Sequence, residues 1–164
     1  MYVTIASFIE DYRNEAAATQ KLLDKLTDES LSTEVLPGYR SLGHLAWHLV
    51  PTGGILQQLG LKAGERYFGQ EAPGEAAAIS RAYAEASGEL LREISEWPDQ
   101  RLLESLPMFG LIWQKGYTLN MFVKHEVHHR GQLTVLIRQA GLQPSGVYGP
   151  TKDEWLAMGV PAKV

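Results

Sequence analysis

Apolar residues recur at intervals of three and four along four stretches of the chain, which is the pattern of a helix that buries one face. These stretches cover residues 4–26, 41–59, 75–97 and 117–140. Ser41 is a good first residue for the second helix, and Gly141 suits the position just past the end of the fourth. Pro51 should kink the second helix just after His48, because the ring removes one backbone donor and clashes with the preceding turn. The pattern predicts four long helices.

Less regular stretches separate the predicted helices. Residues 100–103 suggest a single helical turn. Residues 105–116, SLPMFGLIWQKG, are apolar without a helical period, so we expect an irregular loop there, with a short hairpin as the alternative. Thr151 opens a capping-box pattern that predicts a short C-terminal helix through Met158. The predicted fold class is therefore all-α: one domain over residues 1–164, built as an antiparallel four-helix bundle.

The composition fits a globular domain. Of the 164 residues, 45% are hydrophobic and 21% are charged, which argues against disorder. The formal net charge is −4 and no long block of like charges offers a footprint for a polyanion, so nucleic acid is not an expected partner. The N-terminus lacks the pattern of a secretion signal, and no stretch reaches the length of a membrane span. We expect a cytoplasmic protein without a membrane partner.

Histidines are the residues most suited to chemistry in this chain. The sequence has five of them and no cysteine, so any metal ion must be held by nitrogen and oxygen ligands. His125 and His129 are four residues apart in a predicted helix, which aims both imidazoles the same way. His48 lies on the apolar side of another predicted helix. If all three point into one interior, a divalent ion would satisfy nitrogens that are otherwise costly to bury, and it would keep open coordination positions.

Other interpretations of these residues remain open at this point. His44 precedes His48 by four residues, but it lies nearer the helix start, where we expect exposure. His128 points about 100° away from His129 around a helix, towards the surface or an interface. Without a metal, the pair would be core histidines that hydrogen-bond to carbonyls or carboxylates. Gln132 lies on the right face to contact a ligating imidazole. It would equally suit a helix interface.

Three segments together resemble the DinB/YfiT-like family of helical-bundle metalloproteins. They read SLGHLAWHLV, HEVHHRGQL and PSGVYGPTKDEW, and HHRGQ on the last long helix is the specific part. The resemblance implies a four-helix bundle, a metal triad of His48, His125 and His129, a nickel or zinc ion, and a homodimer. Its better understood members use the metal to activate a low-molecular-weight thiol, such as bacillithiol or mycothiol.

The expected reaction follows from the kind of site. Three neutral imidazoles leave a divalent ion its full charge, which lowers the pKa of a bound water or holds a thiolate. We find no convincing acid or base beside the three histidines, so the expected nucleophile is water or an added thiol. We expect a metal-dependent transferase or hydrolase with a small-molecule substrate. The alternatives are a non-catalytic, stress-associated, metal-binding dimer and a plain helical domain with an empty histidine cluster.

Several aromatic residues are candidates for a substrate cleft, although such residues more often belong to a core or a dimer interface. They are Trp47, Tyr67, Phe68, Phe109, Trp113 and Tyr148.

Overall fold

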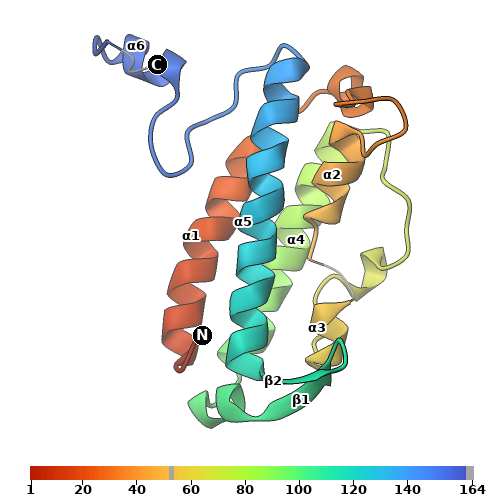
Figure 1. The fold of residues 1–164 in the computed structure, drawn as a ribbon, viewed down its shortest axis with the longest axis vertical. Helices are drawn as coiled ribbons and strands as arrows, with labels where there is room; N and C mark the ends of the chain where they lie inside the picture. The colour runs from red at the N-terminus through yellow and green to blue at the C-terminus, as the bar shows by residue number, and fades with distance from the viewer. Residues whose placement is uncertain (52–53, 162–164) are drawn as a thin grey trace.

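The computed structural model describes residues 1–51 and 54–161 and is mostly helical. Three long helices form its body: α1 (Ile5–Leu23), α4 (Ala76–Ser95) and α5 (Lys115–Gln139). A shorter helix, α2 (Leu42–His48), packs against α4 and α5. In Figure 1, α1 and α5 run upwards while α2 and α4 run downwards, so α5 lies antiparallel to α2 and parallel to α1.

Shorter elements join and extend this body. They are η1 (Asp28–Ser32), α3 (Ile55–Gln58), η2 (Glu65–Tyr67), η3 (Asp99–Leu103), β1 (Ser105–Met108), β2 (Leu111–Gln114) and α6 (Lys152–Ala157). A helical turn at residues 100–103 and a C-terminal helix were both expected, and η3 and α6 confirm them. Thr151 caps α6 with the predicted capping box, and Figure 1 shows α6 apart from the long helices, at the end of an extended connection. Among the described residues, no helix is long and apolar enough to cross a membrane.

The predicted apolar faces of the three long helices meet in one core. Phe8 and Tyr12 of α1, Tyr83 of α4, and Leu119 and Leu133 of α5 are all fully buried. The periodicity therefore identified the core faces of α1 and α4 correctly, but on α5 it placed His125 on the core side, whereas His125 is exposed and Leu119 and Val123 are buried. The helix ends also agree with the prediction to within a few residues.

The second predicted helix is shorter than the sequence pattern indicated. We expected a kinked helix over residues 41–59, but α2 ends at His48 and a separate short helix, α3, begins at Ile55. Residues 52–53 lie outside the described residues. The amides of Leu49 and Val50 bond to carbonyls only three residues back, which tightens the last turn, and Pro51 has no amide to continue it. The proline ends the helix here and does not merely bend it.

Residues 105–116 contain a β-hairpin, so the predicted irregular loop is wrong and its alternative, a short hairpin, is correct. Strands β1 and β2 pair antiparallel, with Met108 opposite Leu111. The two residues between them, Phe109 and Gly110, have φ values of 52° and 78°. Positive φ at both central residues is what a type I′ turn requires, and this turn matches the twist of a hairpin. The hairpin lies across the lower end of the helices in Figure 1.

Two glycines of α5, one in close contact with the N-terminal residues and one in open space, allow a matched test of how tightly this helix packs. A Cβ atom on Gly116 would lie 2.1 Å from the carbonyl oxygen of Tyr2, whereas one on Gly131 would meet nothing within 4 Å. We expect Gly116→Ala to lower the free energy of unfolding by about 1–3 kcal/mol through overpacking. Gly131→Ala should raise it by about 0.5–1 kcal/mol, since alanine favours a helix interior. Urea unfolding of both variants measures the difference, and a loss of stability in Gly131→Ala would contradict this account.

Candidate metal centre

Three histidine side chains converge where the end of α2 meets the middle of α5. His48 is the last residue of α2, and His125 and His129 lie one turn apart on α5. One ring nitrogen from each of the three lies within 4.8 Å of the other two, and the Nε2 atoms of His48 and His125 are 3.1 Å apart. Two imidazoles that share a tetrahedral zinc ion have nitrogens about 3.3 Å apart, given Zn–N bonds of about 2.0–2.1 Å. The three side chains therefore fit a divalent metal ion without rearrangement of the helices.

The three imidazoles differ in their exposure. His129 is 8% exposed, but His48 and His125 are both accessible to solvent. We expected all three to point into one interior; they do converge, but two of them are exposed and not buried. His48 and His125 line an open pocket, and His129 lies beside them with its side chain buried. A ligand can therefore approach from solvent.

A hydrogen-bonded side chain orients the innermost imidazole. His129 Nδ1 lies 2.8 Å from Gln132 Oε1, and because an amide oxygen only accepts, Nδ1 carries the proton. Nε2 is then left with a free lone pair for a metal. Gln132 Nε2 in turn donates to His128 Nε2 at 3.2 Å. The expected contact of Gln132 is confirmed, and His128, which we placed at the surface, supports it from outside the triad.

His44 does not join the cluster. Its Nδ1 atom lies 3.1 Å from the hydroxyl of Ser41, and its side chain is exposed at the start of α2. His44 lies one turn nearer the start of α2 than His48 and is not among the three residues whose nitrogens converge. The ranking of His48 above His44 agrees with this placement.

The environment of His48 and His125 keeps these two imidazoles neutral. Burial lowers the pKa of His48 to about 4, and the neighbouring His129, Arg40 and His125 act in the same direction. Burial also lowers the pKa of His125, with His129, His128 and Arg40 adding to the effect. A metal ligand must offer an unprotonated nitrogen, so His48 and His125 can each accept a cation at neutral pH.

Acidification should destabilise the metal-free protein over a defined range. His48 has a pKa of about 4 in the folded state and 6.5 as its ordinary value, so between these pH values the unfolded chain binds more protons. The free energy of unfolding therefore falls as the pH drops through this range. Urea titrations of chelated protein at several pH values measure the slope. His48→Gln should flatten it and His44→Gln should not, and an equal slope in both variants would count against this explanation.

A pocket of about 650 Å³ opens beside the triad. Its walls are mostly apolar and come from α2, α3, the hairpin and α5; they include Leu49, Ile55, Phe68, Phe109, Trp113 and Phe122. Of the predicted cleft aromatics, three therefore line the pocket. Trp47 and Tyr67 instead pack edge to face, with centroids 5.7 Å apart. Tyr148 lies elsewhere, with its ring against Arg130.

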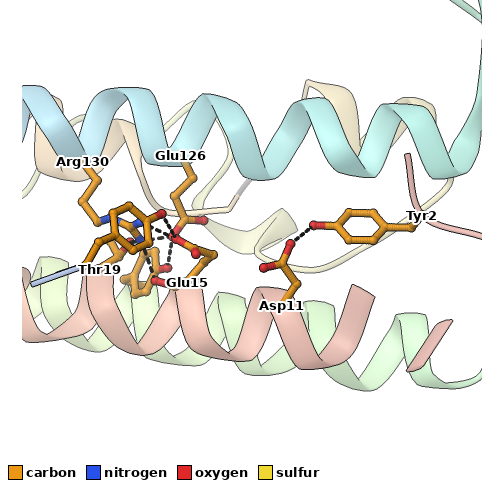
Figure 2. A network of polar contacts seen from close by, with 8 residues as sticks. Tyr2, Asp11, Glu15, Thr19, Glu126 and Arg130 are labelled. Carbon is orange, nitrogen blue, oxygen red and sulfur yellow. Dashed lines mark hydrogen bonds and ion pairs between the residues drawn. The ribbon is translucent and has the colours of Figure 1, made fainter. Parts of the chain in front are cut away.

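Two charged residues of α5 that sequence reasoning missed are fully buried. Arg130 is 2% exposed; it forms an ion pair with Glu15 and donates to the Glu15 carbonyl at 2.8 Å. Glu126 is also 2% exposed and accepts hydrogen bonds from Thr19 and Tyr83. Figure 2 shows Glu126 and Arg130 of α5 facing Glu15 and Thr19 of α1. Glu126 and Arg130 are four residues apart in the sequence. This spacing favours an ion pair within a helix, and it was the sequence feature that could have drawn attention to these two residues.

The hydrogen bonds and the ion pair of Glu126 and Arg130 hold the part of α5 that carries His125 and His129. Burial raises the pKa of Glu126, although its hydrogen bonds and Arg130 oppose the shift. Because Glu126 follows His125 and Arg130 follows His129, bonds that fix these two side chains also fix the turn of α5 that carries the histidines. A rigid ligand helix is what a preorganised metal site needs.

Comparisons with known proteins agree with the resemblance noted in the sequence. The family model described as the DinB family matches residues 1–160. The YrdA protein of Bacillus subtilis (strain 168) is 39% identical over 166 residues, which cover 99% of this chain and 98% of YrdA. A crystal structure of a DinB-like protein from Bacillus cereus ATCC 10987 shares 41% identity and superposes with a TM-score of 0.84. It matches 90% of this chain and 100% of that one.

A solved structure with much lower sequence identity to this chain has the same fold. The DinB-like protein YjoA from Bacillus subtilis is 14% identical and superposes with a TM-score of 0.68, over 88% of this chain and 99% of its own. A family match along nearly the whole chain, with relatives that match it end to end, shows that this chain belongs to the DinB family.

Proposed function

We propose that the protein is a metal-dependent transferase or hydrolase whose divalent ion, zinc or nickel, is held by His48, His125 and His129. The observation that carries this proposal is the approach of three imidazole nitrogens to within 4.8 Å of one another, two of them from residues that line a solvent-accessible pocket. The scaffold we propose is a four-helix bundle in which α2 is the short member.

The lining of the pocket supports an external nucleophile. Among the described lining residues there is no serine, threonine, tyrosine or cysteine, so no hydroxyl or thiol of the chain is placed to attack a substrate. A bound divalent ion supplies Lewis acidity, which lowers the pKa of a water or thiol ligand. Either a low-molecular-weight thiol or water then has to enter from the pocket. We favour the thiol, because the apolar walls and the scarcity of basic groups suit a transfer reaction better than a self-contained hydrolase.

The residues around the triad have defined parts in this proposal. Gln132 holds the tautomer and the ring orientation of His129. The apolar walls limit the water that reaches the reacting atoms, which strengthens every electrostatic interaction there. Glu126 and Arg130 hold the helix through their buried contacts with α1 and α4.

Thiol conjugation measured with and without metal tests this function. Purified protein is assayed with bacillithiol, mycothiol or cysteine and the electrophile chlorobimane, as purified, after chelation, and after zinc or nickel is restored. We expect a rate above the uncatalysed background that disappears on chelation and returns with the metal. Stoichiometric metal without any metal-dependent turnover of thiols or of hydrolysable esters would support the non-catalytic alternative. A rate that survives complete chelation would exclude metal catalysis.

We also propose a homodimer, as the family resemblance implies. Exposed apolar side chains on and after α6 support it: Trp155 is 37% exposed, and Leu156 and Met158 are each 55% exposed. Light scattering coupled to gel filtration measures the mass in solution. A monomeric mass at micromolar concentration would exclude the dimer.

A further inference from the structure

Aromatic side chains form the outer rim of the histidine pocket. Phe109 and Trp113 reach it from the hairpin, and Phe68 reaches it from the connection that follows η2. The rings of Phe109 and Trp113 meet edge to face, with centroids 5.8 Å apart. Phe68 and Phe109 are nevertheless 55% and 68% exposed, so little of either ring is used to fill the core. These rings are placed where a ligand in the pocket would cover them.

Phe109 also occupies an unfavourable backbone position. Its φ is 52°, a left-handed value that bulky side chains rarely adopt, and it is the one non-glycine residue with positive φ among those described. Asparagine and glycine are the residues that suit this place in a type I′ turn. A phenylalanine there costs stability and gains almost no burial in return. The side chain is therefore explained better by a contact outside the folded chain.

Among the described residues that line the pocket, Lys124 is the one exposed charged side chain, and it is cationic. Lys124 and His128 line the pocket together with His48 and His125. The one carboxyl group among the described lining residues is Glu126, which is buried and bonded to Thr19 and Tyr83. The chain as a whole has a net charge of −4, so a cationic side chain at this pocket does not follow from the overall composition.

We propose that the pocket binds an amphipathic organic anion, whose apolar body lies against Phe68, Phe109 and Trp113 and whose acidic group faces Lys124. This names a substrate class for the proposed function and rests on that function for its chemistry, but the recognition itself needs no metal. A volume of about 650 Å³ suits a small organic molecule. The apolar rim supplies affinity and the lysine supplies selectivity for charge.

Calorimetric titration of the chelated, full-length protein with three probes tests the proposal. Phenylbutyrate has both the ring and the acid, phenylbutanol has only the ring, and butyrate has only a short acid. We expect phenylbutyrate to bind more tightly than either of the others. Chelation ensures that no metal coordinates the carboxylate. Metal content, measured separately, decides the proposed function, so a protein without stoichiometric metal that still prefers phenylbutyrate would reject that function and keep this inference.

Two variants, each with a matched control, test whether Lys124 and Phe109 make phenylbutyrate bind more tightly than the other probes. Lys124→Gln should weaken phenylbutyrate about three- to fivefold, as for a partly exposed ion pair, and leave phenylbutanol unchanged. Phe109→Asn should weaken both phenyl probes about tenfold, through loss of aromatic contact, while the melting temperature stays the same or rises. Lys152→Gln on α6 should change neither probe. Ile112→Asn is the control on the hairpin, because Ile112 is 71% exposed and does not line the pocket.

Three outcomes would overturn the proposal. The first is no measurable binding of any probe. The second is equal affinity for phenylbutyrate and phenylbutanol, with Lys124→Gln without effect. The third is a melting temperature that falls by several degrees in Phe109→Asn but not in Ile112→Asn, since Phe109 would then be a structural residue.

Discussion

Replacing His129 by alanine is expected to abolish stoichiometric metal binding and to weaken the affinity for zinc at least about a hundredfold. Loss of a supporting hydrogen bond to a metal ligand already costs about ten- to a hundredfold, and loss of the ligand itself costs more. His129 is the buried member of the triad and the one with an oriented ring, so no neighbouring side chain can take its place. Elemental analysis of untagged protein, followed by competition with a chromogenic zinc chelator, measures both effects.

A graded series gives this prediction its controls. Gln132→Ala should weaken zinc by about tenfold, because His129 keeps its nitrogen but loses its fixed tautomer. His44→Ala should leave the metal content unchanged, since His44 bonds to Ser41 and lies outside the cluster. Circular dichroism shows whether each variant is folded. Full metal content in His129→Ala, or its loss in His44→Ala, would mean that a different set of ligands holds the ion.

The second large effect concerns stability. We expect Arg130→Met to lower the free energy of unfolding by about 3–5 kcal/mol, the usual cost of removing one partner from a buried ion pair. Arg130 is 2% exposed, and its removal leaves the Glu15 carboxylate, whose side chain is 12% exposed, without its cation. Glu126 would lose the same nearby charge. Chemical denaturation of the metal-free protein measures the loss.

The matching experiments separate the ion pair from simple loss of packing. Arg138→Met, on the exposed side of the same helix, should cost less than about 1 kcal/mol. The double variant Glu15→Gln with Arg130→Met should recover part of the loss, because no buried carboxylate of that pair is then left uncompensated. If Arg130→Met and Arg138→Met cost the same, the buried network would not be a source of stability.

The sequence was most informative where one periodic signal dominated. The three long helices were predicted to within a few residues, because each buries a continuous apolar face in the same core. The second helix was predicted too long, because the apolar period resumes after Pro51 and periodicity alone cannot show that the backbone breaks there. At residues 105–116 we preferred a loop to the hairpin, again because the local sequence pattern was misleading. Its turn is Phe-Gly instead of Asn-Gly, and Pro107 lies within β1, so the usual hairpin signals are absent.

The candidate site was predicted in its composition but not in its surroundings. The spacing of His125 and His129 and the apolar stripe around His48 were enough to bring the three together. Their exposure was predicted wrongly, because a helical pattern shows which side a residue faces and not whether that side is filled. Glu126 and Arg130 were overlooked because charged residues on a long helix are usually solvated, and only tertiary packing shows that these two are not.

The distribution of the triad along the chain has a consequence for folding. His48 and His125 are separated by 77 residues, whereas His125 and His129 share one turn of a 25-residue helix. A seven-residue helix such as α2 is not stable by itself in water, so His48 reaches its place only when α2 docks. A partly folded chain therefore offers a metal ion two ligands, and the native protein offers three. The rise in metal affinity during refolding should therefore report the time at which α2 docks.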